Sequence, residues 1–347
     1  MKKLAEIQQD LAPTLQKAEA IRRKQLALLH KKRLWYIIPA LIMLSALVAA
    51  IYTREYYALM AGAMLAGMAV FLIHTFATSG VGFEFKWDFK RSVFRKFVQI
   101  AYPAVSYKAS TKPPATMLLK SGLFTSFDQY HVEDHFEGKT ANGQAYQFMQ
   151  LHTLKFNHSR DENGRDVTTT SPLFSGLLFE LAAPVQLMDD VVIFTPSPSR
   201  INLDIFNGWA KKAKFKKKSI KELYPDLAIS EATKETYQVI FRSLDTAGLL
   251  LESGVLKALQ NFNERWKMKV HCAWIDDKIY VSLPCSFDFF EAKMDQSLQD
   301  PQVVRKLLAQ TQICFHLLED LSQLPFQQSI IMTNFDGNDS YDHLIDY

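Results

Sequence analysis

The chain has 347 residues, 48% of them hydrophobic and 22% charged, which excludes a disordered chain, a collagen and a many-span transporter. Its 40 Lys and Arg against 36 Asp and Glu give a net charge of +4, a near balance that does not indicate a nucleic-acid partner. Three cysteines are too few for a disulfide framework and favour a reducing compartment. The basic charge is concentrated at the start, because residues 1–33 carry nine Lys or Arg and three Asp or Glu.

Residues 3–33 have apolar side chains at helical spacing, which predicts an N-terminal amphipathic helix. Two interpretations stay open for its apolar stripe. It pairs with a second copy as a short coiled coil, giving a homo-oligomer through residues 3–33, or it docks on the protein's own body. Pro13 interrupts an ideal heptad pattern and favours docking.

Two uncharged apolar runs follow, Leu34 to Tyr52 and Tyr56 to Phe76, and three residues separate them. A helix of 19 residues is about 28 Å long, close to the roughly 30 Å hydrocarbon core of a bilayer. Aromatic residues stand at the ends of both runs, where they suit the lipid–water boundary. The pattern predicts a transmembrane helical hairpin over residues 34–76.

Basic residues flank the predicted hairpin on both outer sides, whereas the intervening loop holds only Arg54. Because cytoplasmic flanks are enriched in Lys and Arg, we expect a cytoplasmic (inner) membrane protein with two spans and both termini in the cytoplasm. A basic-aromatic juxtamembrane segment, residues 77–109, comes next. Its phenylalanines either meet the membrane interface or pack into the following domain, and its expected lipid-facing basic residues are Lys90, Arg91, Arg95 and Lys96.

Residues 110–325 have the pattern of a cytoplasmic α+β domain, and residues 326–347 that of an acidic, polar C-terminal tail. Ser110–Ala115 reads as a linker. Alternating apolar residues joined by short turns predict an antiparallel β-meander, with strands expected at residues 130–140, 145–157, 167–181 and 191–195. Further strands are expected at 235–242, 268–275 and 278–283, and helices at 248–266 and 301–321.

Several short motifs lie in this domain, namely SGLF at Ser121–Phe124, Leu-His-Thr at Leu151–Thr153 and FSGLLF at Phe174–Phe179. With Asp128, Tyr130 and Gly138 they resemble the bacterial two-span membrane-protein family called domain of unknown function 3137. The resemblance runs from the N-terminus to about Leu321 and implies the same architecture but no established activity. It marks as structural motif residues Gly122, Phe124, Gly138, Phe174, Gly176 and Phe179.

His131, Glu133, His135 and His152 form the richest group of potential metal ligands. On a hairpin turning at Asn142-Gly143, all four side chains share one face. The two histidines on one strand are roughly 13 Å apart, however, which is too far for one ion. We therefore expect a polar face and no metal or cofactor, while metal binding by this hairpin stays open.

A run of lysines is the strongest electrostatic feature after the juxtamembrane segment, and its expected lipid-facing members are Lys211, Lys212, Lys216, Lys217 and Lys218. A solvated loop is the other interpretation. The sequence contains no GxSxG, HExxH, CxxC or P-loop motif. The favoured function is a membrane-anchored binding or scaffolding module. The alternatives are a metal-dependent hydrolase, or an accessory subunit of a transport or envelope-maintenance complex.

Overall fold

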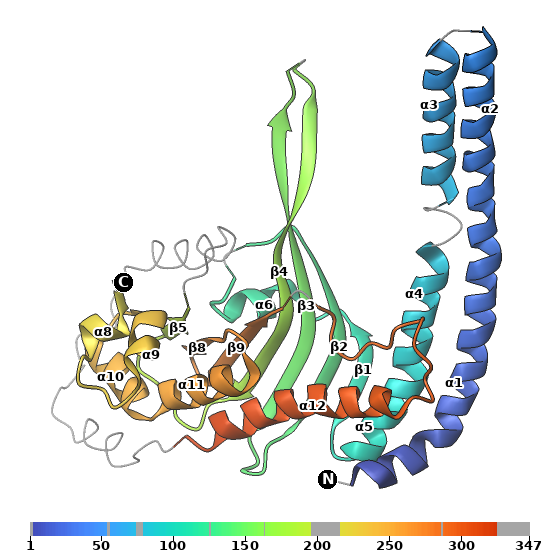
Figure 1. The fold of residues 1–347 in the computed structure, drawn as a ribbon. Coiled ribbons are helices and arrows are strands. Elements are labelled where there is room, and N and C mark those ends of the chain that lie inside the picture. Colours follow the sequence, from blue (N-terminus) through green and yellow to red (C-terminus); the bar gives the residue numbers. More distant parts are fainter. Residues whose placement is uncertain are drawn as a thin grey trace, which may run out of the picture. The chain divides into compact units, whose positions relative to one another are not determined.

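A computed structural model describes residues 3–53, 56–73, 79–124, 126–162, 164–195, 216–285 and 287–324 (Figure 1). The chain forms two compact units. The first contains residues 1–111, 134–136 and 288–312, and the second contains residues 112–133, 137–287 and 313–347. The predicted C-terminal tail and two of the expected lipid-facing lysines, Lys211 and Lys212, lie outside the described residues.

The first unit is mostly helical. Its elements are α1 (Leu4–Arg33), η1 (Leu34–Tyr36), α2 (Ile37–Thr53), α3 (Tyr56–Leu72), α4 (Ser79–Asp88), the π-helix η3 (Phe89–Phe94), α5 (Arg95–Ala101) and β1 (Ser106–Thr111). The long N-terminal helix expected from the sequence is confirmed. Ile7, Leu11 and Leu15 are buried, and α1 contacts α4, η3 and α5, so the first half of the apolar stripe docks on the protein's own body, whereas Ile21 and Leu28 are exposed.

One helix in the described part of the chain, Leu4–Thr53, is long and apolar enough to cross a membrane, and a shorter apolar helix covers Leu59–Leu72. α3 ends at Leu72, and the end of the predicted second span, residues 74–76, lies outside the described residues. α2 and α3 pack against each other. A Cβ atom added at Gly62 would lie 2.1 Å from the Cβ of Ala46, so their backbones approach closely there.

The second unit contains most of the sheet. Its elements are α6 (Ala115–Lys120), β3 (Ala145–Arg160), β4 (Asp166–Ala182), β5 (Val191–Phe194), β6 (Lys216–Ser219), α8 (Ile220–Leu223), α9 (Glu231–Thr236), β7 (Gln238–Phe241), α10 (Leu244–Glu252), α11 (Val255–Trp266), β8 (His271–Ile275) and β9 (Lys278–Pro284). Two further elements, β2 (Gln129–Lys139) and α12 (Pro301–Ser322), contribute residues to both units.

The nine described strands are ordered β1-β2-β3-β4-β9-β8-β5-β7-β6. The expected antiparallel sheet is confirmed, but the meander holds only from β1 to β4, because β4 then pairs with β9 and not with β5. The β8–β9 hairpin turns at Asp276-Asp277 as expected, with Asp276 in the left-handed region at φ 53°. β1 was not expected, because its sequence runs into the turn-rich stretch that predicted a linker.

Two segments differ from their predictions because of local backbone signals; one was expected to be a single helix and the other a strand. The single helix expected over residues 248–266 is two helices, α10 and α11, separated at Gly254, whose φ of 83° interrupts a helix. The strand expected from residue 235 begins only at Gln238. The side chain of Ser230 accepts a hydrogen bond from the backbone N–H of Thr233 and starts the short helix α9.

Candidate functional site

Lys90 lies in the first unit, fully buried in the π-helix η3. Phe89, Val93 and Phe94 of the same short helix are also buried, so most of this helix faces the interior. π-helical turns are rare and occur frequently at functional sites. A lysine is almost never fully buried without a partner, and the surroundings of Lys90 supply one.

The partner of Lys90 is Asp134 on β2, which is also fully buried. The Lys90 Nζ lies 2.5 Å from the Asp134 Oδ2, and the hydroxyl of Tyr107 donates to the other carboxylate oxygen at 2.6 Å. Lys90 Nζ also lies 3.5 Å from the Glu291 Oε1. Each charged group of the pair therefore has at least two polar neighbours, as a buried ion pair requires.

One member of this pair and one residue next to Glu291 have backbone conformations that residues other than glycine rarely adopt. Asp134 has a φ of 51° within a strand, and Phe290, one residue before Glu291, has a φ of 59°. A left-handed conformation is unusual for an aspartate and an outlier for a phenylalanine. Such strain costs about 1 to 3 kcal/mol at each residue and concentrates at functional sites, where the surrounding structure holds it in place.

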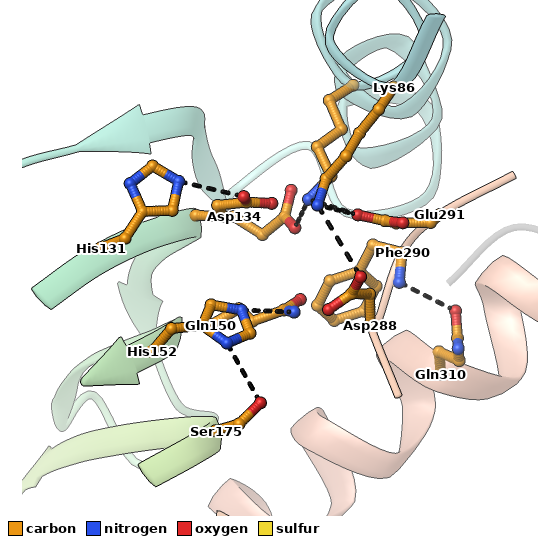
Figure 2. A network of polar contacts seen from close by, with 12 residues as sticks. Lys86, His131, Asp134, Gln150, His152, Ser175, Asp288, Phe290, Glu291 and Gln310 are labelled. Carbon is orange, nitrogen blue, oxygen red and sulfur yellow. Dashed lines mark hydrogen bonds and ion pairs between the residues drawn. The ribbon is translucent and has the colours of Figure 1, made fainter. Parts of the chain in front are cut away.

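A second group of charges, which is partly exposed, adjoins the buried pair (Figure 2). Lys86, one helical turn before Lys90, lies with its Nζ 2.5 Å from the Glu291 Oε1 and 3.8 Å from the Asp288 Oδ2. The side chains of Lys86 and Glu291 are about one quarter exposed, at 24% and 23%. The whole group has two cations and three carboxylates, so it is close to electrically neutral.

Aromatic rings surround the buried pair. Phe94 and Phe136 each contact the rings of Tyr107 and Phe290 and also contact each other, and the Phe94–Tyr107 and Phe94–Phe290 ring centroids are both 5.0 Å apart. All four residues are buried. This apolar surrounding excludes water and strengthens the attraction between Lys90 and Asp134. The arrangement can hold a charge pair rigidly, but it offers Lys90 no access to a substrate.

Lys90 was expected to face lipid, and that prediction is wrong, because burial against Asp134 removes it from the surface. Arg91, Arg95 and Lys96 are exposed, and the Arg91 guanidinium lies over the Trp87 ring at 5.5 Å. The phenylalanines of the juxtamembrane segment were expected either to meet the membrane interface or to pack into the following domain. Phe89 and Phe97 are buried within the unit, so they pack into the protein.

The histidine-bearing hairpin lies mostly in the second unit, although His135 belongs to the first, and several of its polar side chains form hydrogen bonds (Figure 2). The His131 Nε2 lies 3.0 Å from the Glu133 Oε1. Both ring nitrogens of His152 have protein partners, the amide of Gln150 at 3.1 Å and the hydroxyl of Ser175 at 3.0 Å. Within the described ranges no group of three or more His, Cys, Asp or Glu is placed to hold a metal ion.

The described lysines of the basic run form β6, the last strand in the order of the sheet. Lys216, Lys217 and Lys218 are exposed, and the Lys217 Nζ lies 5.2 Å from the centroid of the Phe194 ring. Lysines on a terminal strand disfavour edge-to-edge aggregation between sheets. Their exposure is compatible with lipid headgroups and with solvent, so the lipid contact stays a prediction.

The motif residues have structural roles in the second unit. Phe124 and Phe174, from two separate motifs, pack edge to face with ring centroids 5.2 Å apart. Gly122 adopts a φ of 65°. A Cβ atom at Gly176 would lie 2.1 Å from the carbonyl oxygen of Leu283, so β4 and β9 need a glycine at this position. The Asp128 carboxylate accepts the backbone N–H of Phe156 at 2.7 Å, which lowers the pKa of Asp128.

Sequence reasoning missed the buried pair, although one signal was available. Asp134 follows Glu133, and adjacent strand residues face opposite sides, so the pattern indicated that at least one of the two acids points toward the interior; the structure buries both. A buried carboxylate requires a cation, and the nearest basic segment precedes β1. The pattern could not identify Lys90 as that cation, because residues 77–109 contain six Lys or Arg.

Comparisons with known proteins found one family match and one distant structural likeness. A mycobacterial protein of known crystal structure, the trehalose monomycolate transport factor A, aligns with 65% of this chain and 93% of its own, at 9% identity and a TM-score of 0.28. No curated protein sequence matches the chain. A model of the family described as protein of unknown function (DUF3137) matches residues 172–323. The resemblance to this family, inferred from the sequence motifs, is therefore confirmed over residues 172–323.

Proposed function

We propose that the chain is an integral protein of the inner membrane with two spans and both termini in the cytoplasm, and that its folded part is a binding or scaffolding module. The observation that carries this proposal is the exposure of apolar side chains on α2 and α3. Within α2 only Pro39 and Ala46 are buried, while Ile51 is 71% exposed and Met64 on α3 is 81% exposed. In water such a surface is unfavourable, and in lipid it is not.

The contact between α2 and α3 also suits a bilayer. Ala46 faces Gly62, and Ala66, four residues further along α3, is buried as well. Small residues at helix contacts let backbones approach closely, which is how membrane helices associate without a hydrophobic driving force. α3 has 17 residues and a length of about 26 Å, at the short end of the range for a span.

The charges on either side of the hairpin support the cytoplasmic orientation. Lys24 and Lys31 are exposed before the first span, and Arg91, Arg95 and Lys96 are exposed after the second. Lys90 no longer contributes to this surface charge, but the balance of basic flanks still favours cytoplasmic termini. The buried pair that Lys90 forms is suited to fixing the helix that follows the hairpin, as an anchored scaffold requires.

Alkaline carbonate extraction of cell membranes tests the anchor. We expect the protein to stay in the membrane pellet and to retain its full mass of 39.7 kDa, because neither helix is removed during maturation. A peripheral membrane protein from the same cells, which carbonate releases, is the control for extraction. Release into the supernatant, or a mature chain that lacks the first apolar segment, would contradict the proposal.

A further inference from the structure

Residues 288–300, here called the strap, link β9 to α12 along the chain and have no helix or strand of their own. All of them belong to the first unit. Despite its irregular backbone the strap is not a loose surface loop, because Phe289, Phe290 and Leu298 are buried. Charged side chains hold the strap at two places. One set comes from the helix that precedes the apolar hairpin in the sequence, and the other from the helices that follow it.

The first attachment comes from the helix that follows the hairpin. Lys86 of α4 and Lys90 of η3 both approach the Glu291 carboxylate, at 2.5 Å and 3.5 Å. Beside them the backbone N–H of Phe290 donates to the Gln310 side chain at 3.0 Å. The left-handed Phe290 is held between this hydrogen bond and the stacked ring of Phe94.

The second attachment comes from the helix that precedes the hairpin. Glu19 and Arg22 of α1 form a buried bidentate pair with two distances of 2.8 Å. The same Glu19 carboxylate accepts the backbone N–H of Leu298 at 2.9 Å, and Arg22 donates to the carbonyl oxygen of Met294 at 2.6 Å. Arg22, together with Arg23, lowers the pKa of Glu19 to about 2, so the carboxylate is charged at neutral pH.

We propose that the strap couples the two membrane-proximal helices, so that a change in the spacing of α1 and α4 releases it. Glu291 and Leu298 are seven residues apart, and one is held by α4 and η3 while the other is held by α1. A short strap held at both ends cannot follow both helices if they move apart. A change in the spacing of the two helices would thereby reach β9 and α12, which the strap connects along the chain. The inference rests on the proposed function only in placing the hairpin in lipid.

Hydrogen exchange of two backbone amides in the full chain tests the coupling, because each amide reports on one attachment. In the Glu19→Gln variant we expect the Phe290 amide, at the opposite attachment, to exchange roughly tenfold faster. In the Lys86→Met variant we expect the same acceleration at the Leu298 amide. Lys86 is used because it is partly exposed, so its replacement leaves the buried Lys90–Asp134 pair intact.

Arg160→Gln is the matched control, since it breaks an exposed ion pair with Asp166 in the second unit and should change neither amide. Acceleration confined to the amide beside each substitution would overturn the coupling. A third variant, Gly62→Leu, separates α2 from α3 and should accelerate both amides. No change at either amide would mean that the strap does not respond to the hairpin. These results do not depend on topology, so they can fail separately from the proposed function.

Discussion

Replacing Lys90 with methionine should destabilise the protein by about 3 to 5 kcal/mol, because the Asp134 carboxylate would remain buried without its cation. Methionine keeps most of the side-chain volume, so the loss reflects charge and not a cavity. We expect the effect as a lower urea midpoint for unfolding of the detergent-solubilised full chain. Tyr107 would still donate to Asp134, but one hydrogen bond does not replace an ion pair.

A second substitution distinguishes loss of the pair from general damage. Asp134→Asn in the Lys90→Met background removes the unpaired charge, and asparagine tolerates the left-handed φ of 51°. The double variant should recover at least about half of the lost stability. Lys221→Met, which breaks an exposed pair with Glu235, is the control and should leave the midpoint unchanged. A Lys90→Met protein as stable as the parent would contradict the buried-pair account.

Gly176→Ala should cost about 3 kcal/mol, because the new Cβ would meet the Leu283 carbonyl oxygen at 2.1 Å. This contact is with backbone, so no side-chain rotation can relieve it. Gly176 lies in β4, opposite Leu151 of β3 and Pro284 of β9, and the strain would spread through three strands. The urea midpoint and slope of the variant measure the effect.

Gly138→Ala is the matched comparison within the same sheet. Its Cβ would meet the hydroxyl of Tyr146 at 2.5 Å, which is the far end of a side chain that can move. We expect a loss below about 1.5 kcal/mol. Equal losses in the two variants would show that close backbone approach is not the reason for the glycine at position 176.

Elements with strong local patterns were predictable from the sequence. The β8–β9 hairpin follows from two apolar runs around Asp276-Asp277, and α12 follows from Asp300, which accepts the backbone N–H of Gln302 at 2.8 Å. The pairing of β4 with β9 was not predictable. About one hundred residues separate these strands, and no short-range pattern reports on contacts of that kind.

The candidate site depends almost entirely on such distant contacts. Lys90, Asp134 and Glu291 come from three parts of the chain, and each has an ordinary local explanation as a surface charge. Helical spacing correctly indicated that Phe89 and Phe97 share a face. It could not distinguish lipid from protein as the surrounding of that face, because both are apolar.

Labelling of single cysteines in spheroplasts tests the central claim, a two-span anchor with a cytoplasmic domain, most directly. In a background without Cys272, Cys285 and Cys314, cysteines replace Lys17 on α1, Arg54 between the spans and Lys257 on α11, one in each variant. An impermeant maleimide should label the Arg54→Cys variant and leave Lys17→Cys and Lys257→Cys unlabelled until the cells are lysed. Labelling of Lys257→Cys in intact spheroplasts, with Lys17→Cys protected, would instead indicate one span and a domain outside the cytoplasm.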